Sequence, residues 1–179
     1  MISIKTPRMI EGMKESGRLL RSVHENLSKI IVPGITTLEI DSFVEKYLKE
    51  HGATPEQKGY MGFPFATCAS VNDEICHGFP SNRELKDGDI VTIDMVVNKD
   101  GYLSDSAWSY AVGNISDEAK LLMDVTKEAM YKGIEIVKPG AHFGDIGVVI
   151  EEYVSQFGFS VVKDFIGHGI GRKMHEDPQ

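Results

Sequence analysis

Two aspartates, Asp94 and Asp105, are the residues of this sequence whose types and spacing most clearly predict chemistry. Asp94 lies within an apolar run, where β propensity disfavours aspartate and burying an unpaired carboxylate costs on the order of several kcal/mol. A lone strand aspartate usually has an arginine or lysine partner, but two carboxylates on one face repel each other unless a cation lies between them. A bound metal ion is therefore the most economical explanation of the pair.

The two aspartates share a face because segments 90–97 and 102–112 read as two strands joined by a tight turn. A two-residue loop at residues 100–101 makes the aspartates diagonal neighbours, and a loop at residues 99–100 places them directly opposite each other. Both registers leave the carboxylates on one face, several ångströms apart.

A histidine, His168, is the third expected metal ligand. It follows the strand-like run 159–166, and glycines 167 and 169 on either side allow backbone or a ligand to approach closely. Most lone histidines are structural, but one presented by glycines at a strand end is a better ligand candidate. Two aspartates and one imidazole suit Mn, Fe, Co or Zn. The alternative, a phosphate-binding GHGIG loop, requires a following helix that the sequence does not predict.

Four helices are expected around these strands, in two pairs. Their predicted spans are about 7–30, 36–52, 116–137 and 144–157. A shift of 106 residues aligns the second pair with the first and matches six residues without a gap, which indicates an internal duplication. The first half continues for 61 residues after Gly52, to Gly113, whereas 21 residues follow Gly158, so we expect the second half to be incomplete.

Composition predicts one soluble cytoplasmic domain over residues 1–179. The net charge of −8 argues against a specific nucleic-acid partner or an anionic membrane surface. The charged N-terminal residues do not resemble a signal peptide, and no apolar stretch is long enough to span a membrane. Cys68 and Cys76 fit two reduced thiols better than a disulfide framework.

Five motifs, taken in order, resemble those of the bacterial type I methionine aminopeptidases. They are CHGFP at 76–80, TIDMV, LSDSAW, GHGIG at 167–171 and MHEDPQ at 174–179. The resemblance implies the α+β, two-layer αβ pita-bread fold, with two pseudo-symmetric halves of which the second is incomplete here. It also implies two divalent metal ions per complete site (Co, Mn, Fe or Zn), a metal-bound hydroxide, and removal of the initiator methionine from nascent proteins.

The same resemblance assigns roles to individual residues. Asp94 would chelate one metal, Asp105 would bridge both, and His168 would bind the other. His77 and His175 would be catalytic and substrate-binding residues that contact the scissile amide and the substrate carbonyl. The pocket for the methionine side chain would be formed by Tyr60, Phe63, Cys68 and Met174. The first two of these are expected almost equally well to be core anchors of their loop.

The family's site also requires two glutamates on strands that follow the MHExP motif, and the sequence ends before them. We therefore expect residues 1–179 to be a truncated or degenerate form. Such a chain should be poorly stable, bind at most one metal weakly and lack aminopeptidase activity.

Two alternatives stay open at this point. One is a prolidase or creatinase-type hydrolase, which usually carries an additional N-terminal domain. The other is a non-catalytic pita-bread binding module, against which the three intact ligand positions argue. The expected partners of the favoured enzyme are nascent polypeptide N-termini, including those at the ribosome. We expect no specific nucleic acid, no membrane and a monomeric protein.

Overall fold

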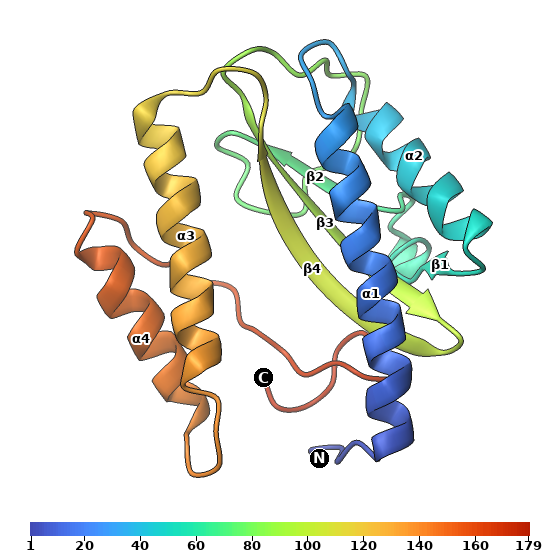
Figure 1. The fold of residues 1–179 in the computed structure, drawn as a ribbon, viewed down its shortest axis with the longest axis vertical. Helices are drawn as coiled ribbons and strands as arrows, with labels where there is room; N and C mark the ends of the chain where they lie inside the picture. The colour runs from blue at the N-terminus through green and yellow to red at the C-terminus, as the bar shows by residue number, and fades with distance from the viewer. The chain divides into compact units, whose positions relative to one another are not determined.

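The computed structural model describes residues 1–179, which form two compact units. The first unit comprises residues 1–115 together with 167–179, and the second comprises residues 116–166. Figure 1 shows the elements of each unit. All the residues predicted from the sequence to form the site belong to the first unit.

Helices α1 (Pro7–Ile30) and α2 (Thr37–Glu50) confirm the first two predicted helices. The Thr6 hydroxyl caps α1 by accepting a hydrogen bond from the backbone of Met9 at 3.3 Å. Thr36 and Glu39 form the predicted capping box at the start of α2. None of the helices is both long enough and apolar enough to cross a membrane.

The sheet of the first unit is antiparallel and is organised around its central strand β3 (Ile90–Lys99). Strand β4 (Tyr102–Ala111) pairs with one edge of β3 along its whole length. Strands β1 (Thr54–Pro55) and β2 (Cys68–Val71) pair with the other edge, and a short 3₁₀ helix, η1 (Tyr60–Gly62), lies between them in sequence.

The turn between β3 and β4 selects the first of the two predicted registers. Lys99 pairs with Tyr102, so the loop consists of Asp100 and Gly101. Both loop residues have positive φ, 53° and 77°, as a type I′ hairpin turn requires. Asp94 consequently pairs with Ala107, which makes Asp105 its diagonal neighbour on the same face.

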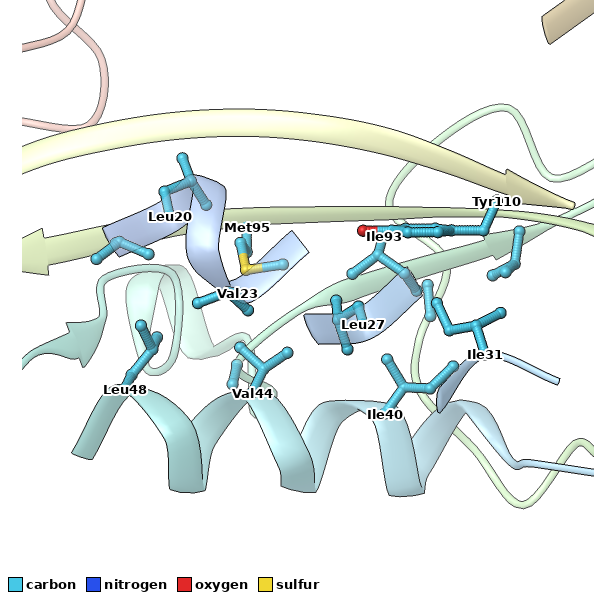
Figure 2. Close-up of a cluster of buried hydrophobic side chains, with 14 of the residues drawn as sticks. Leu20, Val23, Leu27, Ile31, Ile40, Val44, Leu48, Ile93, Met95 and Tyr110 are labelled. Carbon is cyan, nitrogen blue, oxygen red and sulfur yellow. The ribbon is translucent and has the colours of Figure 1, made fainter. Parts of the chain in front are cut away.

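The main core lies between one face of the sheet and the helices α1 and α2 (Figure 2). The sheet contributes alternate residues of β3, among them Ile93 and Met95, which have no solvent exposure. Complete burial of such a side chain contributes roughly 1.5–3 kcal/mol. The helices contribute buried side chains at helical spacing, namely Leu20, Val23, Leu27, Ile40, Val44 and Leu48.

A buried histidine, His24, joins α1 to β4 within this core. Its Nδ1 lies 2.7 Å from the Tyr110 hydroxyl, its Nε2 lies 2.9 Å from the Ser106 hydroxyl, and its ring stacks on Trp108 with centroids 4.7 Å apart. Burial lowers the pKa of His24 from its ordinary 6.5 to about 4, against the opposing effect of the Ser106 hydrogen bond. The imidazole is therefore neutral at neutral pH.

A second polar contact fastens α1 to the same strand. The Ser16 hydroxyl donates to the carbonyl of Val97 at 2.9 Å and lies 2.8 Å from the Ser104 hydroxyl. Ser104 and Ser106 flank Asp105 in sequence and point to the opposite face of β4. Contacts with α1 thus hold the residues on both sides of Asp105, on the face of β4 opposite to the Asp105 carboxylate.

The second unit is a helix pair, α3 (Asp117–Glu135) and α4 (Phe143–Ser155), close to the predicted spans. Val125, Ala129 and Val154 form its core. An apolar groove of about 500 Å³ lies between the helices and residues 159–162.

The prediction of a strand-like run over residues 159–166 is wrong, because these residues form no strand. The amide of Phe159 donates to the carbonyl of Val154 at 3.2 Å, and Phe159 and Val161 pack against the α3 and α4 cluster. Phe159 and Val161 therefore contribute to helix packing rather than to a sheet.

The predicted duplication is supported by the backbone at its matched glycines. Gly34 and its counterpart Gly140 have φ of 96° and 94°, and Gly52 and Gly158 have φ of 64° and 80°. Each pair holds the same left-handed conformation at the same point of its helix pair, which glycine adopts without steric cost.

We predict that His24 makes the folded state less stable as the pH falls from 6.5 to 4. The unfolded chain takes up a proton in this window and the folded chain does not, so this group alone should remove about 3 kcal/mol of stability. Urea denaturation followed by circular dichroism at pH 7 and pH 5 measures the effect. In His24→Gln, the free energy of unfolding should change less between the two pH values than in the wild type. In the control His51→Gln, which alters an exposed histidine, it should change as much as in the wild type. An equal change in the free energy of unfolding in all three proteins would contradict this account.

Candidate metal centre

The two predicted carboxylates meet on the face of the hairpin that is opposite to α1. Asp94 and Asp105 lie close enough together to shift each other's pKa. Burial, followed by the negative charge of Asp105, raises the pKa of Asp94 to about 7. Burial also raises the pKa of Asp105, while the nearby His168 opposes this. The negative charges of the two carboxylates thus disfavour each other, and a cation beside them would relieve this repulsion.

His168 is placed beside this pair, as predicted. Its Nε2 lies 3.6 Å from Oδ2 of Asp105, and its Nδ1 lies 3.0 Å from the carbonyl of Gly169. Donation from Nδ1 to that carbonyl leaves the Nε2 lone pair directed at the carboxylates. This tautomer is the one in which an imidazole binds a metal through Nε2.

The segment that carries His168 is attached to the sheet by its backbone. The amide of Leu103 donates to the carbonyl of Gly171 at 2.9 Å, and Gly169 forms a bridge with Glu176. Met174 is buried against Val96 and Leu103 on the same face as the carboxylates. The segment is therefore held over the hairpin without forming a strand of its own.

His175 joins the same group of side chains. Its ring lies 4.5 Å from that of His168 in an edge-to-face arrangement, and its Nδ1 lies 3.2 Å from the Tyr60 hydroxyl. Tyr60 is on η1, far from His175 in sequence. The contact shows that Tyr60 is more than an anchor of its own loop.

His77 lies in an exposed loop with a positive φ of 57°. The next residue, Gly78, fastens this loop to β2 through two hydrogen bonds, from its amide to the Ser70 hydroxyl and from the amide of Ala69 to its carbonyl. A Cβ at Gly78 would collide with the Ala69 carbonyl, so only glycine fits there.

The remaining pocket residues differ in their surroundings. Cys68 is buried and pairs directly with Asp94, and burial raises the pKa of its thiol to about 12. Phe63 belongs to an aromatic cluster with Phe65 and Phe79, at centroid distances of 6.0 and 5.1 Å. No measured contact links Phe63 to the carboxylates, and its part in a methionine pocket stays a prediction.

The types of donor at this site fit a divalent metal. The structure brings the donors together two at a time, Asp94 with Asp105 and Asp105 with His168. Two carboxylates with raised pKa values and one imidazole with a free lone pair form the mixed O/N set that Mn, Fe, Co and Zn bind. No three His, Cys, Asp or Glu side chains are already arranged about one point at which an ion could be held.

Comparison with known families defines the class of the protein, a metallopeptidase. The chain belongs to metallopeptidase family M24, whose sequence model matches residues 11–179. It is 50% identical to methionine aminopeptidase 1 of Bacillus subtilis over 100% of this chain and 72% of that protein. It is 42% identical to the methionine aminopeptidase of Escherichia coli over 99% of this chain and 68% of that protein.

Solved structures show the same fold. The methionine aminopeptidase of Rickettsia prowazekii superposes with a TM-score of 0.97 at 40% identity, over 99% of this chain and 72% of that one. The Xaa-Pro dipeptidase of Bacillus anthracis has a TM-score of 0.84 at 26% identity and is covered over 48% of its length. The pita-bread fold predicted from the motifs is therefore confirmed.

We predict that Asp105→Asn stabilises the metal-free protein at pH 7 by about 1 kcal/mol, because it removes the like charge beside Asp94. The pKa of Asp94 should fall in the variant, and carboxyl NMR during a pH titration measures this. Asp100→Asn, in the exposed hairpin turn, is the control and should change neither quantity. An Asp94 that still titrates near pH 7 in Asp105→Asn would disprove the repulsion.

Proposed function

We propose that the protein is a methionine aminopeptidase that removes the initiator methionine from nascent polypeptides. The observation that carries this proposal is the convergence of Asp94, Asp105 and His168 on one face, in a chain that is 50% identical throughout to a methionine aminopeptidase. The prolidase alternative is less favoured, because the dipeptidase neighbour is only 26% identical.

The proposed cofactor is a pair of divalent metal ions, drawn from Co, Mn, Fe or Zn. Asp94 would chelate one ion, Asp105 would bridge both, and His168 would bind the other. When bound, such ions activate water at neutral pH and polarise a carbonyl. Carboxylate and histidine sites generally need three or more protein ligands for each ion, so we propose that activity requires further carboxylates, the two glutamates expected from the family resemblance.

His175 is proposed to stabilise the negative charge that develops on the substrate carbonyl oxygen. Donation from the Tyr60 hydroxyl to Nδ1, across 3.2 Å, keeps the imidazole proton on Nε2. That Nε2–H can then donate to the oxygen. His77 is proposed to donate a proton to the leaving amide nitrogen.

The methionine side chain would be recognised by Cys68, Met174, Tyr60 and Phe63. Because the Cys68 thiol titrates only at about pH 12, it is neutral and serves as an apolar, polarisable surface rather than a nucleophile. Buried Met174 offers a second sulfur. Such a surface suits a thioether.

The proposed partners are the N-termini of nascent polypeptides, in the cytoplasm and at the ribosome. We propose that the protein acts as a monomer, without a specific nucleic-acid or membrane partner. The net charge of −8 supports the last two points, since an acidic protein is repelled by phosphate-rich surfaces.

The proposal predicts which peptides are cleaved. In a form extended beyond Gln179 by the C-terminal part of the Bacillus subtilis relative, peptides with Met followed by a small residue should release methionine. We also propose that the free N-terminal amine of the substrate binds a metal ion, so an acetylated N-terminus should prevent release. Release of methionine is measured by chromatography after addition of Mn(II) or Co(II). The unextended chain is the comparison and should show no activity, and equal cleavage of acetylated peptides would contradict the recognition scheme.

The Tyr60 contact predicts a separate effect on the rate. In the extended form, Tyr60→Phe removes the hydrogen bond to Nδ1 of His175 and should lower kcat by roughly tenfold, less than the ~10²-fold or greater loss expected when an oxyanion donor itself is removed, because Tyr60 acts only through His175. KM should change less, because the apolar ring is kept. Phe63→Tyr, which leaves the His175 contact intact, is the control. An unchanged kcat in Tyr60→Phe would show that Tyr60 does not orient His175.

A further inference from the structure

One edge of β3 has a gap beside the proposed metal ligand. On this edge, β2 ends by pairing Cys68 with Asp94, and β1 begins by pairing Pro55 with Val97. The two positions between them, residues 95 and 96, have no strand partner on that side. Backbone groups that point into such a gap within a buried sheet require other hydrogen-bond partners.

The side chain of Gln57 fills this gap. Its Oε1 accepts from the amide of Val96 at 2.9 Å, and its Nε2 donates to the carbonyl of Asp94 at 3.4 Å. The side-chain amide thus offers one acceptor and one donor to alternate residues of β3, as the peptide groups of a neighbouring strand would. Gln57 is 8% exposed, so water does not readily replace these bonds.

The neighbouring backbone completes the same edge. The amide of Glu56 donates to the carbonyl of Val96 at 2.9 Å. Residues 56 and 57 together therefore bind both backbone groups of Val96 and the carbonyl of Asp94. The irregular segment between β1 and η1 continues the sheet without being a strand.

We infer that Gln57 is a positioning residue for Asp94 in metal binding, an inference that rests on the proposed function. The direction of the Asp94 side chain follows from the twist of β3 at residues 94–96. Gln57 binds that stretch on the one edge where no strand does. Without it, the Glu56 amide is the only group left that binds Val96 on this edge, and the Asp94 carboxylate loses its fixed orientation toward Asp105.

Gln57 also contacts the proposed methionine pocket. Its Nε2 lies 3.7 Å from Sγ of Cys68, which is the register partner of Asp94. The same amide nitrogen therefore faces a metal ligand's backbone and a pocket wall. A shift of Gln57 displaces both together.

The test compares wild type with Gln57→Met, which keeps the length and apolar volume of the side chain and removes its hydrogen bonds. Both are prepared in the form extended beyond Gln179 that was described above, which supplies the further proposed carboxylates, and Mn(II) alone is titrated in by isothermal calorimetry. We expect Gln57→Met to bind Mn(II) roughly tenfold to a hundredfold more weakly, the usual effect of removing a group that orients a metal ligand. The control, Val44→Ala, opens a cavity on the α2 side of the core without removing a hydrogen bond at the edge of β3, and it should keep the wild-type Kd while lowering the melting temperature.

A second measurement uses the metal-free wild type and does not depend on whether the variant folds. Amide hydrogen exchange by NMR should show Val96 protected as strongly as its neighbours in β3, because its N–H is bound to Gln57. Exchange of Val96 as fast as that of the exposed turn residue Asp100 would overturn the inference.

The outcomes separate the inference from the function on which it rests. A wild type that binds no Mn(II) contradicts the proposed function, and the inference with it. A wild type that binds Mn(II) and a Gln57→Met variant that binds it equally well contradict the inference alone. Weaker binding in Gln57→Met, with unchanged binding in Val44→Ala, supports it.

Discussion

The register of β3 against β4 is the constraint on which the candidate site depends. Side chains alternate between the two faces of a strand, so a slip of one residue would move Asp105 to the α1 side and leave Asp94 alone. The type I′ turn at Asp100 and Gly101 sets this register, and contacts from α1 to both neighbours of Asp105 hold it. The helices, the core and the turn thus fix the relative position of two carboxylates.

Placing two carboxylates side by side is unfavourable by itself, because their negative charges repel each other. The same repulsion would favour a cation between them. Burial of the Asp94 carboxyl group, followed by the negative charge of the neighbouring Asp105, raises the pKa of Asp94 to about 7. A divalent cation between them would reverse the sign of the interaction. Binding of a metal at the proposed site would offset the cost of folding around the pair, so stability and metal affinity would be linked there.

The sequence was sufficient to predict features with local signals. The capping box, the helix pairs and the hairpin depend on residues close in sequence, and the match to family motifs placed Asp94, Asp105 and His168. Residues 159–166 were predicted wrongly, because strand formation needs a pairing partner that a local apolar pattern does not reveal. His24 and Gln57 carried no sequence signal: one is a buried histidine defined by β4, the other fills a gap that exists only once β1 and β2 are in place.

The stacking of Trp108 on His24 has a practical consequence. Trp108 is the single tryptophan of the chain, and its ring lies nearly parallel to the imidazole, at 4°. It is on the face of β4 opposite to Asp105, three residues away. The intrinsic fluorescence of the protein therefore comes from one position, where α1 meets the strand that carries a proposed ligand. An emission spectrum follows the docking of that helix without any added label.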